Sequence, residues 1–330
     1  MIPNKLGPMS VPTAVPSDSL SLPMRAAIVL NRILPRGKGA VPRWIGARIR
    51  KDSRNTVMTR HGARLAVEPS SLDVYAHIVN AGRTWNWNVL AATAAMLRPG
   101  GTLYDIGANI GFVSLEIATI FRTADTSRQV SIVSFEPLPA LAAAIRESAV
   151  LNGLTNVTVR SDVVSDQEGE TELFLGSHSI HASTRARESG SRVLRCPVVR
   201  IDSLVAAGAI PPPTAIKIDV EGGELAALRG AAETIRSHRP EILFESDENT
   251  TRFGYDRRDI LTLLSSLGPY RFLRVTAAGD GVEPLAEDES ATTAPADILA
   301  TTRTDQEITV ISERLRTWAA ARRIVVAGTI

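Results

Sequence analysis

The chain has 330 residues, a formal net charge of +2 and 44% hydrophobic residues, enough for a substantial core in one large domain or one domain with an appendage. Its single cysteine, Cys196, excludes an internal disulfide framework, a multi-cysteine zinc site and an iron–sulfur cluster held only by cysteines of this chain. The nearly neutral charge argues against a chain that binds nucleic acid electrostatically over its whole surface.

The N-terminal part of the chain reads as an extension. Residues 1–22 are rich in Pro and Ser, and we expect them to be disordered. Residues 23–84 form a basic extension, because the many Arg and Lys residues between positions 32 and 60 are opposed only by Asp52. This charge fits a surface for an acidic partner, a membrane or a phosphorylated carrier, but it equally fits a solvated face. The segment 56–67 predicts a hairpin that turns near His61 and Gly62.

No apolar segment is long enough to span a membrane, and none has the position and cleavage site of a signal peptide. We therefore expect a cytoplasmic protein without a transmembrane segment. From residue 85 onward, predicted helices and strands alternate. The expected helices are 86–97, 139–152, 224–238, 256–267 and 311–320, and the expected strands are 102–106, 129–136, 156–160, 215–220, 241–245, 270–275 and 297–302. This alternation predicts an α/β fold with a mainly parallel sheet and helices on both faces, whose ligands lie at the carboxyl ends of the strands.

A glycine loop follows the first strand of this series, with Asp105, Gly107, Asn109 and Gly111 in the pattern Asp-x-Gly-x-Asn-x-Gly. A strand, a tight turn and the start of a helix let backbone approach a nucleotide-like ligand, and the glycines remove the Cβ atoms that would block it. The pattern differs from the dinucleotide fingerprint Gly-x-Gly-x-x-Gly.

Four acids, Asp105, Glu136, Asp219 and Glu245, each fall at the carboxyl end of a predicted strand. At the end of its strand, Glu136 can accept hydrogen bonds from both hydroxyls of a ribose, or it can instead cap the helix after Pro137. Asp105 would repel a pyrophosphate but can receive an ammonium group, or it can merely order the glycine loop. A site that binds a ribose at one end and an amino acid at the other favours S-adenosylmethionine over NAD as its ligand.

The motifs at 105–111 and 134–137, the segment Ile-Lys-Ile-Asp-Val-Glu-Gly-Gly-Glu at 216–224 and the segments 228–231 and 240–245 resemble the FkbM family of S-adenosylmethionine-dependent methyltransferases. The resemblance covers roughly residues 85–302. It implies a class I, Rossmann-like methyltransferase domain over 85–330, with seven strands of which the last is antiparallel. It also implies O-methylation of hydroxyls on sugars, polyketides or other secondary metabolites.

The resemblance assigns roles to residues. It implies that Asp105, Gly107, Asn109 and Gly111 line the methionine part of the cofactor and that Glu136 binds its ribose. Asp162 matches the position that meets adenine, although an Asx-turn is the alternative.

Transfer to an alcohol requires removal of its proton. We expect Asp219 to be the base, with Glu221 and His181 as further candidates. Glu221 can instead cap a helix, and His181 can be an ordinary surface histidine. Asp219 and Glu245 together can hold a divalent cation such as Mg²⁺ that acidifies the hydroxyl.

The sequence therefore predicts an O-methyltransferase that acts on a small molecule or a glycan, with no nucleic-acid partner. Two alternatives remain open. One is a methyltransferase with a macromolecular acceptor, recruited by the basic extension. The other is a non-catalytic nucleotide-binding protein that retains the sheet.

Overall fold

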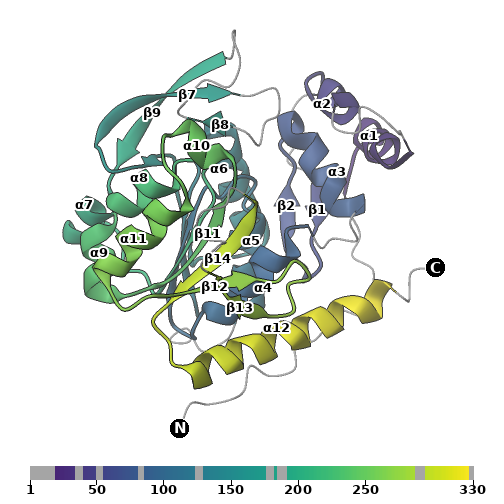
Figure 1. Ribbon diagram of the computed structural model, residues 1–330. Helices are drawn as coiled ribbons and strands as arrows, with labels where there is room; N and C mark the ends of the chain where they lie inside the picture. Colours follow the sequence, from purple (N-terminus) through teal and green to yellow (C-terminus); the bar gives the residue numbers. More distant parts are fainter. Residues whose placement is uncertain are drawn as a thin grey trace.

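The computed structural model describes residues 19–33, 40–49, 55–80, 85–122, 129–175, 182–183, 192–286 and 294–326. Among them, the main sheet has eight strands in the order β13-β12-β14-β11-β10-β3-β4-β5 (Figure 1). Their bounds are β3 (Thr102–Ile106), β4 (Ser131–Phe135), β5 (Val157–Arg160), β10 (Ala215–Ile218), β11 (Glu241–Ser246), β12 (Arg271–Val275), β13 (Val282–Pro284) and β14 (Ala296–Thr301).

The sheet is α/β and mainly parallel, as predicted. Strands β5, β4, β3, β10 and β11 pair in parallel, and β14 runs antiparallel between β11 and β12. The seven predicted strands are present near their predicted positions. The prediction did not include the eighth, β13, which forms a hairpin with β12 at the edge of the sheet.

Helices cover both faces of the sheet, because its strands are apolar on both sides. Leu103, Ile132 and Leu243 belong to one buried core. The helices that contribute to this core are α4 (Trp87–Met96), α5 (Phe112–Ile120), α6 (Pro139–Leu151) and α12 (Asp305–Val326). The sequence neighbours of those three strand residues, such as Tyr104 and Phe244, point into a second core. The helices of this second core are α7 (Ile201–Ala206), α8 (Glu224–Arg229), α9 (Ala232–His238) and α11 (Arg257–Leu267). The alternation of side chains along each strand thus assigns residues to one core or the other.

The single helix predicted over 224–238 is instead two helices, α8 and α9, and the prediction was wrong there. The helix is interrupted at Gly230 and Ala231. A Cβ at Gly230 would lie 1.9 Å from the carbonyl oxygen of Ser165. The break therefore accommodates a close backbone approach from a segment distant in sequence.

A second, four-stranded sheet of order β6-β9-β7-β8 was not predicted. Its strands are β6 (Val163–Val164), β7 (Gly169–Leu175), β8 (Ala182–Ser183) and β9 (Arg192–Val199). Pro197 lies within β9, opposite Glu170 of β7. A proline weakens the sequence signal of a strand because it cannot donate a backbone hydrogen bond.

The N-terminal extension packs on the main body. It contains α1 (Leu22–Ile33), α2 (Ala40–Gly46), β1 (Thr56–Met58), β2 (Arg64–Ala66), the 3-10 turn η1 (Pro69–Ser71) and α3 (Leu72–Asn80). Strands β1 and β2 form an antiparallel hairpin, with Val57 opposite Leu65. Met24, Val57 and Tyr75 belong to the same buried cluster as the residues of α4 and α5. The expected disorder of 1–22 falls mainly on residues 1–18, which lie outside the described residues.

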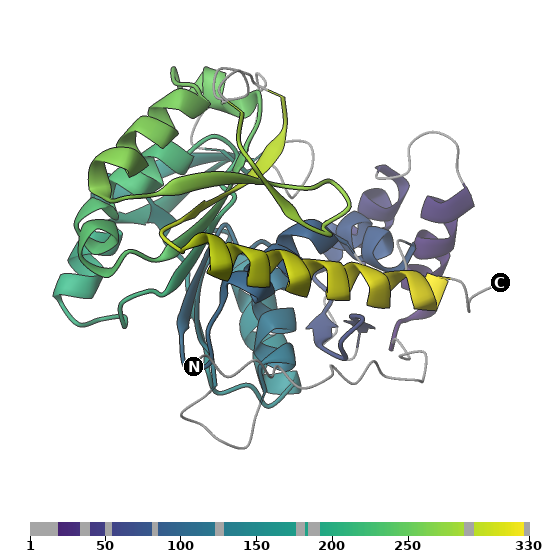
Figure 2. The same cartoon turned by 60° about the horizontal axis from the view of Figure 1, so that its bottom comes forward.

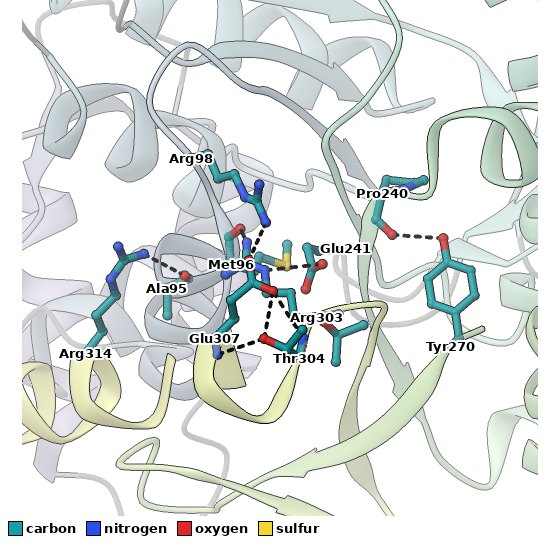
Figure 3. A network of polar contacts seen from close by, with 11 residues as sticks. Ala95, Met96, Arg98, Pro240, Glu241, Tyr270, Arg303, Thr304, Glu307 and Arg314 are labelled. Atoms are coloured by element: carbon teal, nitrogen blue, oxygen red, sulfur yellow. Dashed lines mark hydrogen bonds and ion pairs between the residues drawn. The ribbon is translucent and has the colours of Figure 1, made fainter. Parts of the chain in front are cut away.

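The C-terminal helix α12 crosses the end of the molecule and reaches the β1–β2 hairpin (Figure 2). Figure 3 shows the contacts that hold it. Arg303 donates to the carbonyl oxygen of Met96 and pairs with Glu241 at 3.3 Å, and Arg314 donates to the carbonyl oxygen of Ala95 at 3.2 Å. These arginines satisfy carbonyls at the end of α4, which lack partners within the helix. No helix in the described segments is long and apolar enough to cross a membrane.

Candidate functional site

A cavity of about 570 Å³ lies at the carboxyl ends of β3, β4, β10 and β11. This is the edge at which parallel sheets bind their ligands. Seven of the residues predicted for the site line it: Gly107, Asn109, Glu136, Asp162, Asp219, Glu221 and Glu245. Asp105 and Gly111 do not belong to the lining, and His181 lies outside the described residues.

The glycine loop is shaped by close packing within the protein. Gly107 has φ +79°, and a Cβ there would lie 1.9 Å from the carbonyl oxygen of Asp219. Gly111 has φ +78°, and a Cβ there would lie 2.9 Å from the side chain of Ile145. We expected these glycines to make room for a ligand, but the atoms that approach them are protein atoms. Asn109, also at positive φ (53°), faces the cavity between them.

Asp105 lies behind the cavity wall, with no exposed surface. Its Oδ2 accepts a hydrogen bond from the Ser114 hydroxyl at 2.6 Å, and its Oδ1 pairs with the Lys217 ammonium at 3.1 Å. We expected Asp105 to meet the ligand directly, but its side chain is buried and bonded to Ser114 and Lys217. A buried carboxylate needs such partners, and here Lys217 takes the place that we expected for the ligand's ammonium group.

Lys217 joins the buried acid to the cavity. Its ammonium donates to the carbonyl oxygen of Gly107 at 3.0 Å and lies 3.6 Å from Oδ2 of Asp219, as well as next to Asp105. Burial alone would lower the pKa of Lys217, but the carboxylates of Asp105 and Asp219 outweigh it and raise the pKa. Lys217 is thus a permanently charged link between β3 and β10. A single lysine in the apolar strand Ala-Ile-Lys-Ile was the sequence signal for it.

Glu136 lies at the end of β4 with 5% exposure. Its two oxygens accept backbone hydrogen bonds from Asn109 at 2.8 Å and Leu138 at 2.9 Å. Burial raises the pKa of Glu136 to about 7, although these two N–H donors and Lys217 favour the charged form. Because a carboxylate offers about four lone-pair directions, Glu136 keeps acceptor capacity for a ligand. Its bond to the N–H group of Leu138, the residue before α6, is part of the helix-capping role that we considered as the alternative.

Asp162 lies farther along the same wall, just after β5. Its Oδ2 accepts a hydrogen bond from Nε of Arg160 at 2.8 Å, and 13% of its side chain is exposed. The ion pair fixes the carboxylate at the cavity wall.

At the other end of the cavity the lining includes Asp219, just after β10, and Glu245 of β11, which is paired with Asp297 of β14. Glu245 lies directly opposite Asp297 in the antiparallel ladder, and Asp219 is close enough to hydrogen bond with Glu245. Burial and the carboxylates of Asp219 and Asp297 raise the pKa of Glu245. Burial and Asp219 raise the pKa of Asp297 to about 6, while Lys217 lowers it. Like charges this close favour a shared proton. Asp297, which also accepts a hydrogen bond from Asn88, was missed by the sequence reasoning.

Glu221 lies just past β10, in a turn that forces it into the left-handed region at φ 58°. Glu224 holds this turn, because its Oε1 accepts hydrogen bonds from the backbone N–H groups of Val220 and Gly222. The Glu221 carboxylate accepts a hydrogen bond from the Asn249 amide at 3.2 Å and faces the cavity. The N-cap position of α8 is Gly223, and Glu224 secures the turn before the helix.

Asp219 and Glu245 were expected to hold a divalent cation. Within the described residues, no three His, Cys, Asp or Glu side chains are arranged to hold a metal ion. The two carboxylates lie within hydrogen-bonding range of each other.

The family model and the curated relative both name a methyltransferase. A family model described as "Methyltransferase FkbM domain" matches residues 105–272. The hexuronic acid methyltransferase AglP of Haloferax volcanii is 25% identical over 163 residues, which are 49% of this chain and 61% of that protein. The chain thus spans less than two thirds of the length of this curated relative.

Solved structures of methyltransferases are also similar. The methyltransferase FkbM from Methylobacillus flagellatus KT has a TM-score of 0.40 and 17% identity, with 70% of this chain and 54% of that chain covered. The precorrin-6Y C5,15-methyltransferase from Geobacter metallireducens GS-15 has a TM-score of 0.36 and 14% identity, with 66% and 86% covered.

Proposed function

We propose that the chain, which belongs to the FkbM methyltransferase family, is an S-adenosylmethionine-dependent enzyme that methylates a hydroxyl group of a small molecule or a glycan. One observation carries the proposal. A single cavity has Glu136 and Asp162 along one wall and the carboxylates of Asp219 and Glu245 at its other end. Glu136 and Asp162 suit the nucleoside part of a cofactor. Asp219 and Glu245 suit an acceptor that must lose a proton.

The residues along the first wall fit the cofactor. Glu136 has lone pairs left for the two ribose hydroxyls, and Asp162 is fixed by Arg160 where the adenine would lie. The side-chain oxygen of Asn109 is buried without a hydrogen-bond partner among the described residues, as expected for a group that awaits a ligand. Lys217, held by Asp105, keeps the glycine loop in place through the carbonyl oxygen of Gly107.

S-adenosylmethionine supplies the electrophilic methyl group, so the protein must align the acceptor and remove its proton. We assign proton removal to Asp219, which faces the cavity with 31% of its side chain exposed. The raised pKa of Glu245 favours a proton on Glu245 of the pair. With S-adenosylmethionine bound, the acceptor oxygen would bond to the methyl carbon as the methyl–sulfur bond breaks and S-adenosylhomocysteine leaves, and the proton of the acceptor would pass to the Asp219 carboxylate. Glu221 is the second candidate, and His181 the third.

Substitution of Asp219 tests this assignment. Asp219→Asn should lower the rate of methyl transfer by about 10²–10⁴-fold, the usual contribution of a positioned general base. Its affinity for S-adenosylmethionine, measured by calorimetry, should stay close to that of the wild type. Asp162→Asn is the matched control, which should weaken cofactor binding with less effect on the rate at saturation. Unchanged turnover in Asp219→Asn would remove Asp219 from this role. Tight binding of NAD without binding of S-adenosylmethionine would overturn the cofactor assignment itself.

A divalent cation at Asp219 and Glu245 is the competing role for this pair. We propose the shared proton, because the raised pKa of Glu245 favours its neutral form, which is a poor ligand for Mg²⁺. Turnover should then be the same with a chelator and with added Mg²⁺. Loss of turnover in the chelator, restored by Mg²⁺, would establish the metal instead.

The acceptor class follows from the charge of the cavity and from the relative named for hexuronic acid. A hexuronic acid offers both hydroxyls and a carboxylate, but a carboxylate would meet the negative charge of Asp219. We therefore propose that the methyl group goes to a hydroxyl and forms an ether. Incubation of labelled product in dilute alkali distinguishes the two, since an ether keeps its methyl group and an ester releases methanol.

A further inference from the structure

Helices α1 and α2 carry large apolar side chains on their outer side. Leu22, Val29 and Ile33 of α1 are 82%, 55% and 65% exposed, and Trp44 of α2 is 60% exposed. The positions 22, 29 and 33 recur at helical spacing, so they form one stripe. The opposite side of α1, with Met24, Ala27 and Ile28, is buried. The exposed stripe is therefore additional to the face that packs on the protein.

Basic side chains flank this apolar surface. Arg25 and Arg32 of α1 are exposed, and the guanidinium of Arg48 lies 4.0 Å from the ring centre of Trp44. None of these three arginines pairs with a carboxylate within the part of the chain that the structure describes. The sequence from 19 to 51 contains no Asp or Glu, and its basic residues are Arg25, Arg32, Arg36, Lys38, Arg43, Arg48, Arg50 and Lys51.

Helices α1 and α2 lie side by side at one end of the molecule, away from the main sheet (Figure 1). They contact α3 on their inner side. This arrangement leaves their outer side free of other described elements. We give the name α1–α2 face to the exposed side chains Leu22, Arg25, Val29, Arg32 and Ile33 of α1, together with Trp44 of the adjoining α2 and Arg48 just after it.

We propose that the α1–α2 face binds the surface of an anionic lipid bilayer. Helices that lie in a membrane interface combine an apolar stripe with Lys and Arg, and they bind through buried apolar area together with attraction to anionic lipid. The indole of Trp44 suits the boundary between headgroups and acyl chains. The arginine stems can lie along the apolar surface while their charged ends reach lipid phosphates.

Two other occupants fit less well. In a twofold dimer through this face, Arg25, Arg32 and Arg48 would meet the same arginines of a second copy, and like charges would repel. Nucleic acid would satisfy the arginines but would leave Leu22, Val29 and Ile33 without apolar partners. Of these three occupants, a bilayer interface alone supplies both negative charge and an apolar layer.

Vesicle flotation with the full chain tests the proposal. Vesicles of phosphatidylcholine with phosphatidylglycerol are compared with vesicles of phosphatidylcholine alone. We expect at least about tenfold stronger binding to the anionic vesicles, weakened by salt because of charge screening. Trp44→Ser with Val29→Ser should abolish the binding, and Arg25→Gln with Arg32→Gln should weaken it about tenfold or more.

Matched controls lie elsewhere on the surface. Val150→Ser removes an apolar side chain of α6 that is more exposed than Val29 or Trp44, and Arg64→Gln removes an exposed charge from β2; both variants should bind vesicles like the wild type. Circular dichroism confirms that each variant is folded. The proposal is overturned by equal binding to both kinds of vesicle or by no binding. It is also overturned by a dimer in solution that Trp44→Ser disrupts, or by tight binding of a DNA oligonucleotide that depends on Arg25 and Arg32 but not on Val29.

Discussion

Glu136 is the residue through which pH should act on cofactor binding. Its pKa is raised to about 7 by burial, and only its ionised form can accept hydrogen bonds from both ribose hydroxyls. The affinity for S-adenosylmethionine should therefore fall as the pH drops below 7, approaching about tenfold per pH unit. Calorimetry across this range measures it, and Glu136→Gln should bind more weakly with a flatter profile. A flat wild-type profile would contradict the role of Glu136.

The same raised pKa has the opposite effect on stability. A carboxyl whose pKa rises from 4.5 to about 7 on folding binds its proton more tightly in the folded state. Its contribution to stability is fully present below pH 4.5 and is lost as the pH rises through 7. The difference in free energy of unfolding between the wild type without cofactor and Glu136→Gln, followed by urea titration at several pH values, should change in this direction. No change between pH 4.5 and 8 would show that Glu136 is not buried as described.

Lys217 should matter for stability as well as for the site. Replacement by Met leaves the fully buried carboxyl of Asp105 without its cation, which should lower the free energy of unfolding by about 3–5 kcal/mol. The double variant Lys217→Met with Asp105→Asn removes the unpaired charge and should recover part of this loss. Urea denaturation measures both. Equal losses in the single and double variants would show that the two side chains do not act as a pair.

The sequence allowed prediction that Glu136, Asp219 and Glu245 lie at one edge of the sheet, because the carboxyl ends of parallel strands meet there. It did not allow prediction of their partners. Asp105 turns toward Lys217 because β3 and β10 are neighbours with Asp105 opposite Lys217, and that register depends on distant parts of the chain. For the same reason, the glycine pattern indicated a close approach at Gly107 but not that the approaching atom belongs to Asp219.

At the scale of elements, the main strands could be predicted because each is a short apolar run between turn signals. The second sheet could not, since β9 carries Pro197 and its pairing with β7 is established only in three dimensions. The break between α8 and α9 depends in the same way on the contact of Gly230 with Ser165.

The attachment of α12 gives a prediction at this scale. Arg303 both donates to Met96 and pairs with Glu241, a buried carboxyl whose pKa is raised by burial and lowered by Arg303. Arg303→Leu should therefore lower the free energy of unfolding by about 3–5 kcal/mol. Arg314→Leu, which removes only the hydrogen bond to Ala95, should cost about 1 kcal/mol. Equal losses in urea titrations would mean that the pair with Glu241 contributes little.

For the whole molecule, the extension and the methyltransferase body share one core although the sequence suggested separate segments at 23–84 and 85–330. The junction lies at His61, in the turn between β1 and β2. Its ring stacks on Trp87 at 6.0 Å and lies 5.5 Å from Trp318, and its Nδ1 lies 3.1 Å from Oε2 of the fully buried Glu116 of α5. The first and last helices of the body thus meet at a residue of the extension.

This junction predicts that the chain unfolds as one unit. Trp87 and Trp318 report on the junction by fluorescence and far-UV circular dichroism reports on the helices and sheet, so the two urea transitions should coincide. Trp44→Phe with Trp85→Phe serves as the background, because it leaves Trp87 and Trp318 as the only tryptophans of the sequence. In that background His61→Ala should lower the free energy of unfolding by about 1–3 kcal/mol, since Glu116 would lose its partner in a buried place. It should do so without separating the two transitions. An early fluorescence transition that leaves the circular dichroism signal intact would instead identify the extension as an independent domain.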